Sequence, residues 1–182
     1  MAHLHHLAGQ DRMTHELRGL AAPQKGMGQM HASSEWKGGY RSILSDGRGH
    51  EVPVDLPKNE DGDDTGTSSL ELTVLSMAGC ISTIFALVAE RRKLPFESLR
   101  VDLDAERPKG SPTIARVVGT VHVRSSAPAE DVEAAVAITV RTCPVGVLFH
   151  QARIPVDVRT IVEPPLSTRP PGNLPRAAVP GA

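Results

Sequence analysis

The feature that most constrains this chain is an apolar run, residues 72–89, within the stretch SLELTVLSMAGCISTIFALVAERRK. Ser68 can cap the start of a helix, and Glu71, three residues later, can complete a capping box. The basic residues 91–93 suit a helix C-terminus, and Pro95 cannot continue the helix. The sequence therefore predicts one long helix from Ser69 to Lys93.

The same run is at the lower length limit for a membrane-spanning helix. It contains four hydroxyl side chains, namely Thr73, Ser76, Ser82 and Thr83, and the sequence has no second run of this kind. A helix that is apolar on most faces is more often the central helix of a soluble core. We therefore expect no membrane association.

Charge and composition argue against nucleic-acid binding. The 182 residues carry a formal net charge of −1, and aromatic residues make up 3% of the chain. Such a chain has no basic field to attract phosphates and few aromatic side chains to stack on bases. Histidines interrupt the start, MAHLHHLAGQDRM, where a secretory signal needs an apolar segment. We expect a cytoplasmic protein whose cysteines are reduced or form a transient disulfide.

The hydrophobic periodicity of residues 31–162 predicts a single α+β domain. Alternating segments around Asp46-Gly47 predict a hairpin, and a second hairpin follows the long helix. The expected segments are, in chain order, a short strand near Trp36, Tyr40–Ser45, His50–Asp55, Ser69–Lys93, Leu99–Ala105, Ile114–Arg124, 127–142, 143–153 and 154–162. The predicted element order is β-β-β-α-β-β-α-α-β.

Two segments lie outside this domain. Residues 1–30 are rich in histidine without the spacing of a zinc site, and we predict a disordered leader. Residues 163–182 hold six prolines and are predicted to be a disordered tail. No metal or cofactor motif is present in the sequence.

The chain has two cysteines, Cys80 and Cys143, with 62 residues between them. Cys143, in TCP, is predicted at a helix N-terminus, with Thr142 as the cap and Arg141 nearby, and this setting favours a thiolate. Cys143 could equally be a small buried hydrophobe. Cys80 lies deep in the long helix, where a thiolate would need a cation from elsewhere, for which Arg41 is a candidate.

Three quoted stretches, EWKGGYRSILSDGRGHEVPVDLP, DTGTSSLELTVLSMAGC and VRTCPVG, agree in order and spacing with one known family. Over residues 31–162 the chain resembles the OsmC/Ohr family of osmotically inducible and organic hydroperoxide resistance proteins. The resemblance implies an intertwined homodimer in which curved antiparallel sheets surround long central helices.

The resemblance also implies a chemistry. Cys80 would attack the O–O bond of a hydroperoxide and become a sulfenic acid, and Cys143 would condense with it to a disulfide. A small dithiol, lipoyl-type in the organic hydroperoxide branch, would then restore both thiols. No cofactor is implied.

In that branch an arginine directly follows a glycine pair, and a glutamate lies ten residues before the first cysteine. Here Tyr40 separates Gly38-Gly39 from Arg41, and Glu71 stands one residue after the family's glutamate position. With these differences the chain resembles the OsmC-like branch more closely, and Arg41 and Glu71 are candidate partners of the thiolate. Two other functions stay open: a non-enzymatic thiol module (redox sensor or sulfur or acyl carrier), and a dimer that binds an apolar ligand.

Overall fold

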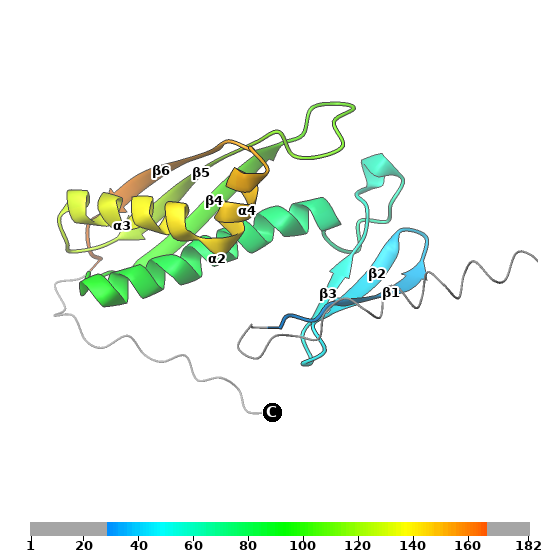
Figure 1. Cartoon of the computed structure of the whole chain (residues 1–182), viewed down its shortest axis with the longest axis horizontal. Helices are drawn as coiled ribbons and strands as arrows, with labels where there is room; N and C mark the ends of the chain where they lie inside the picture. Colours follow the sequence, from blue (N-terminus) through cyan, green and yellow to red (C-terminus); the bar gives the residue numbers. More distant parts are fainter. Residues whose placement is uncertain (1–28, 167–182) are drawn as a thin grey trace, which may run out of the picture. The chain divides into compact units, whose positions relative to one another are not determined.

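The computed structural model describes residues 29–166, which divide into two compact units between Gly66 and Thr67. The predicted leader, 1–30, and tail, 163–182, lie almost entirely outside the described residues, so those predictions stay untested. The strands and helices follow one another in the predicted order, with a short 3-10 helix, η1 (Lys58–Glu60), added before the long helix (Figure 1).

The first unit is an antiparallel three-stranded sheet of β1 (Ser33–Gly38), β2 (Arg41–Ser45) and β3 (Glu51–Val54). The turn between β1 and β2 needs two glycines, because Gly38 and Gly39 have φ angles of 105° and 56°.

Among the described residues of this unit, only Val54 and Asp55 are buried. Trp36 and Tyr40 are 71% and 59% exposed, so the sheet has almost no core of its own. A sheet of this size needs an apolar face packed against another layer to be stable.

The second unit contains a sheet in the order β4 (Ser98–Glu106), β5 (Arg116–Arg124), β6 (Val156–Glu163). β4 and β5 form the predicted antiparallel hairpin, whereas β6 pairs with β5 in parallel. The expectation of purely antiparallel sheets is therefore wrong in this detail. Two parallel neighbours need a long crossover, and the two helices between β5 and β6 provide it.

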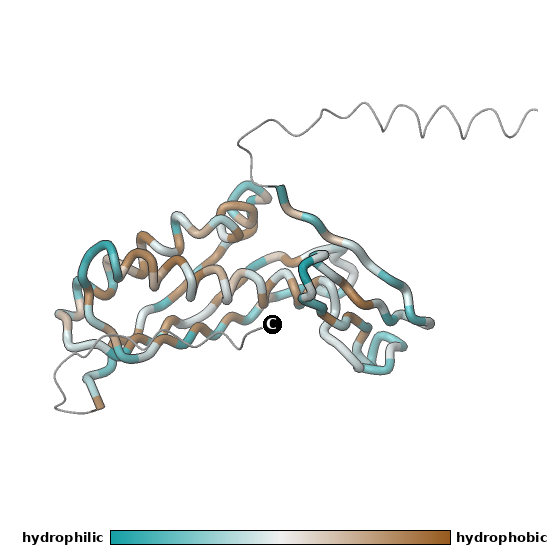
Figure 2. The backbone as a smooth tube through the Cα atoms, turned by 90° about the horizontal axis from the view of Figure 1, so that it is seen from below, coloured by the Kyte–Doolittle hydropathy of each residue, from teal (hydrophilic) through white to brown (hydrophobic). Residues whose placement is uncertain are grey.

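Three helices lie on one face of this sheet: α2 (Ser69–Arg92), α3 (Ala129–Thr142) and α4 (Pro144–Gln151) (Figure 1). α2 begins with the predicted capping box and ends at Lys93, which adopts a left-handed conformation. Its fully buried residues recur every four positions, at Met77, Ile81, Phe85 and Ala89. Figure 2 shows the apolar residues spread along the helices and strands of this unit.

By length and composition α2 could cross a membrane, because its most apolar window has a hydropathy of 2.1, and 22% of that window is buried. α3 and α4 pass the same test as a pair, but the chain bends by 61° between them. The core helix of a soluble protein also passes this test. The row of buried residues that α2 turns to the sheet shows that one face does serve as core.

Candidate functional site

Cys80 lies at the middle of α2, beside the row of fully buried residues. Its side chain is half-buried and packs against the core together with Ile84 and Val88, which follow it at spacing four on the same side of the helix. Within one chain Cys80 is thus placed at the edge of the core and is only partly buried.

Cys143 occupies the junction between α3 and α4 and is fully buried. Its backbone N–H donates to the Thr139 carbonyl, which ends α3, and its Sγ accepts a hydrogen bond of 3.4 Å from the Gly146 N–H, which caps α4. The predicted cap, Thr142, instead donates to the Ile138 carbonyl inside α3. The cysteine therefore caps the helix itself, one residue later than predicted.

The fold brings the two cysteines together, although 62 residues separate them in sequence. Both are reduced, and the Cys143 thiol is hydrogen-bonded to the Cys80 side chain. Burial, followed by this hydrogen bond, raises the pKa of Cys143 from 9.0 to about 11, while the Gly146 N–H opposes the rise. The two thiols therefore interact directly, and Cys143 is a weaker acid than an ordinary cysteine.

Gly146 is a site residue that the sequence analysis missed. A side chain there would be crowded, because an added Cβ would lie 3.2 Å from the Val140 carbonyl oxygen and 3.7 Å from the Cys143 sulfur. The spacing C-x-x-G could have indicated it, since an N-cap side chain accepts from the N–H two or three residues later.

Arg41 begins β2 in the first unit, where its Nε lies 3.8 Å from Asp63 Oδ2. Both side chains are largely exposed. Since Cys80 belongs to the second unit, the pairing of Arg41 with the thiolate stays a prediction. Arg141, considered as a source of positive charge, is not among the principal causes that shift the pKa of Cys143.

Glu71 lies in the first turn of α2, and its Oε2 accepts hydrogen bonds from the backbone N–H and the hydroxyl of Ser68, both at 2.7 Å. It precedes Cys80 by nine residues, which places the two on opposite sides of an ideal helix, about 13.5 Å apart along its axis. Within one chain Glu71 is thus a capping residue that does not reach the sulfur.

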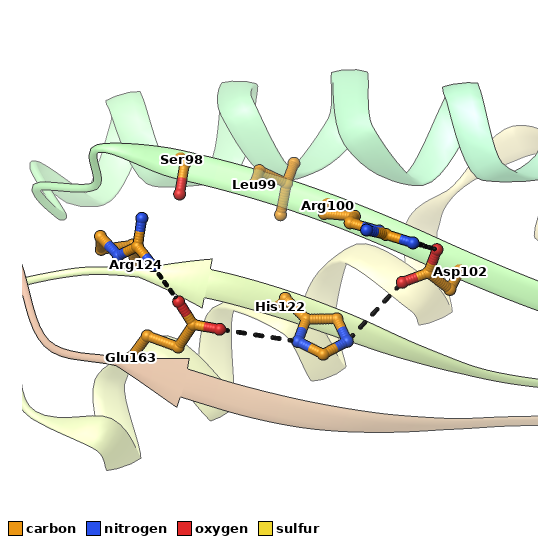
Figure 3. A pocket seen from close by; sticks show the side chains of 7 residues that line it. All are labelled: Ser98, Leu99, Arg100, Asp102, His122, Arg124 and Glu163. Atoms are coloured by element: carbon orange, nitrogen blue, oxygen red, sulfur yellow. Dashed lines mark hydrogen bonds and ion pairs between the residues drawn. The ribbon is translucent and has the colours of Figure 1, made fainter.

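A separate charged pocket of about 450 Å³ lies on β4, β5 and β6 (Figure 3). His122 sits between Asp102 at 3.6 Å and Glu163 at 3.9 Å, and these carboxylates pair with Arg100 and Arg124 respectively. The charged side chains alternate along the strands with the buried valines, so they occupy the sheet face away from the helices. Its charges balance one another, and neither cysteine lines it. The described part of the chain has no group of three side chains suited to a metal ion.

Residues 62–159 match the protein family described as OsmC-like protein. A search of the curated proteins finds no match. The fold is similar to an OsmC-like protein from Mycoplasma pneumoniae, with a TM-score of 0.66 at 11% identity, covering 74% of this chain and 97% of that one.

Two structures described as organic hydroperoxide resistance proteins are also similar. The one from Elizabethkingia anophelis, with thiocyanate bound, has a TM-score of 0.63 at 17% identity and covers 77% of this chain and 100% of its own. The one from Legionella pneumophila has a TM-score of 0.58 at 17% identity, with coverages of 75% and 98%. These likenesses confirm the predicted α+β fold.

Proposed function

This chain belongs to the OsmC-like protein family, and on that premise we propose that it is a thiol-dependent peroxidase that reduces organic hydroperoxides. The observation that carries the proposal is the interaction between Cys80 and Cys143, of which Cys80 is half-buried and Cys143 is fully buried with a raised pKa. Hydroperoxide resistance in the names of two structural neighbours supports this substrate class and a role in defence against oxidative stress.

In the first step the Cys80 thiolate attacks the terminal oxygen of the hydroperoxide, and the O–O bond breaks. The alkoxide leaves with a proton as an alcohol, and Cys80 is oxidised to a sulfenic acid. Cys143 keeps its proton at neutral pH, because burial and the neighbouring sulfur raise its pKa to about 11. Its S–H can therefore hold the Cys80 thiolate in place until the peroxide arrives.

In the second step the Cys143 sulfur attacks the sulfenic sulfur, water leaves, and a disulfide forms. The hydrogen bond between the two side chains means that this step needs little backbone movement. A small dithiol, of the lipoyl type, then reduces the disulfide by two exchange reactions and returns both thiols.

Arg41 and Glu71 belong to this proposal as auxiliary residues. Arg41 supplies the positive charge that a thiolate needs, and Glu71 is the carboxylate partner of that guanidinium. A homodimer is part of the same proposal, because the first unit has almost no buried residues in its described part and α2 exposes Leu75 and Leu87 by 56% and 43%. A second copy would cover both surfaces, in a cytoplasmic protein whose reducing environment supplies the dithiol.

The test is consumption of cumene hydroperoxide by the purified full-length chain with dihydrolipoamide as the dithiol. We expect turnover in the wild type and loss of at least about 100-fold in Cys80→Ser, since the thiolate is the nucleophile. Ser76→Ala, on an exposed position of the same helix, is the matched control and should keep wild-type turnover. Equal rates in Cys80→Ser and the wild type would rule the mechanism out.

The same assay tests the auxiliary residues. Arg41→Ala is expected to lower kcat/KM by about tenfold, as the loss of one charge interaction near a thiolate does. Arg48→Ala removes an exposed arginine from the same unit and serves as its control. A disulfide that forms reversibly without peroxide turnover would instead favour the redox sensor, and two unreactive thiols would favour the ligand-binding dimer. Sedimentation of the purified chain as a monomer would remove the dimer from the proposal.

A further inference from the structure

The two sulfurs of the proposed disulfide differ in access, and this difference bears on how the disulfide is reduced. Within a single chain, Cys143 has 0% of its surface exposed, whereas Cys80 is half-buried at the edge of the core. A thiolate attacks a disulfide in line with the S–S bond, from behind the sulfur that it approaches. The attacked sulfur must therefore be reachable on the side away from its partner.

Resting on the proposed function, we infer that the reducing dithiol attacks Cys80 and that Cys143 is the leaving sulfur, received by the backbone N–H of Gly146. The mixed disulfide then joins the reductant to Cys80. Its second thiol attacks its own bound sulfur, which releases a cyclic disulfide and the Cys80 thiolate. Two electrons pass from the dithiol to the protein, and Cys143 takes up a proton as it returns to the thiol.

The first turn of α4 offers a hydrogen-bond donor to the leaving Cys143 sulfur. In the reduced protein the Gly146 N–H already donates to Cys143 Sγ at 3.4 Å, and it acts to lower the pKa of that thiol. A glycine at position 146 lets its N–H lie close to the Cys143 sulfur. A larger residue would be crowded there, because its Cβ would lie 3.2 Å from the Val140 carbonyl oxygen. A thiolate appearing on Cys143 therefore finds a donor in place without reorganisation.

One effect opposes this order of events, because a thiol with a raised pKa is a poorer leaving group. The rise from 9.0 to about 11 is caused by burial and by the hydrogen bond and negative charge of Cys80. In the mixed disulfide Cys80 is neutral and covalently bound to the reductant, so it no longer raises the pKa of Cys143. The part of the rise that is due to burial remains, and it makes Cys143 a slower leaving group than an ordinary cysteine. Attack on the fully buried sulfur, by contrast, requires local opening of the core.

The test traps the mixed disulfide in the full-length chain. The Cys80–Cys143 disulfide is made with diamide, so that its formation does not depend on peroxide turnover. Excess 2-mercaptoethanol is added, acid stops the exchange, and the unfolded chain is blocked with a maleimide before peptide mass spectrometry. We expect mercaptoethanol on Cys80 and maleimide on Cys143 in at least about a tenfold excess over the reverse. An equal mixture, or an excess on Cys143, would overturn the inference.

A second measurement covers the case in which the mixed disulfide closes again too quickly to be trapped. Cys143→Ser and Cys80→Ser each leave a single cysteine, which is loaded with thionitrobenzoate. Dihydrolipoamide should release the dye from Cys80 at least about tenfold faster than from Cys143, because the protein sulfur is the atom attacked. Equal release rates would contradict the inference. Loss of peroxide turnover with the expected regiochemistry retained would count against the peroxidase alone.

Discussion

The N-termini of α2 and α4 are both capped by a side chain, but with different atoms. At α2 the acceptors are oxygens, from the Ser68 hydroxyl and the Glu71 carboxylate. At α4 the acceptor is the Cys143 sulfur, which also contacts Cys80. Within one chain the first cap contacts only the start of its own helix, whereas the second also contacts the other cysteine. The comparison shows that one cysteine side chain can cap a helix and, by the same contact, fix the position of its sulfur.

The first prediction separates the two roles of Cys143. In Cys143→Ser the serine hydroxyl can replace the sulfur as the acceptor for the Gly146 N–H, so α4 keeps its cap while the disulfide becomes impossible. After one equivalent of peroxide, Cys80 should stay a sulfenic acid, and dimedone should label nearly every chain. The wild type should show about a tenth of this labelling or less, because the disulfide consumes the sulfenic acid.

Ser68→Ala is the matched change at the other helix. It removes the cap of α2 and should destabilise the protein by about 1 kcal/mol, yet its dimedone labelling should equal that of the wild type. Strong labelling of the wild type would show that Cys143 does not resolve the sulfenic acid, and the comparison would then fail.

A second prediction concerns the reactivity of the two thiols in the folded, reduced chain. The pKa of Cys143 is raised from 9.0 to about 11 by burial and by Cys80, which lowers its thiolate fraction about 100-fold relative to an ordinary cysteine. Iodoacetamide at pH 8 should therefore alkylate Cys143 about 100-fold more slowly than a free cysteine, and also more slowly than the half-buried Cys80. The rates are read from each cysteine peptide by mass spectrometry. Similar rates for the two, with the fold intact by circular dichroism, would contradict the burial of Cys143.

Local signals in the sequence predicted the start of α2 correctly. Ser68 and Glu71 lie within one helical turn, so their reciprocal hydrogen bonds depend on no other part of the chain. The helix start near Cys143 was also predicted, but the cap was assigned to Thr142 because a hydroxyl is the usual cap. The buried contact with Cys80, which decides the position of the sulfur, is not local.

Contacts between distant segments could not be predicted in the same way. The parallel pairing of β6 with β5 depends on how α3 and α4 return the chain, and no residue of β6 encodes its direction. The pocket around His122 draws its carboxylates from two other strands. The pairing of Cys80 with Cys143 was expected only from the family resemblance, because 62 residues separate them and neither segment specifies the other.

The smallest expected effect is on the stability of the fold as a function of pH, which differs between the cap of α2 and the cap of α4. Hydrogen bonds from the Ser68 hydroxyl and N–H lower the pKa of Glu71 below 4.5. A carboxyl whose folded pKa lies below its unfolded value stabilises the fold fully above pH 4.5, and this contribution disappears as the pH falls through the folded pKa. At α4 the direction is reversed, because burial raises the pKa of Cys143 and weakens the fold as the pH rises above 9.0.

Glu71→Gln keeps the capping hydrogen bonds but removes the charge, so it isolates this response. At pH 7 the wild type should be more stable by less than about 1 kcal/mol, since Glu71 is exposed and solvent screens its interactions. Urea unfolding between pH 7 and pH 3 should show this difference shrinking toward zero. A difference that stays constant with pH would mean that the charge of Glu71 adds nothing to the cap. A loss of peroxide turnover without loss of stability would instead assign Glu71 to the chemistry of Cys80.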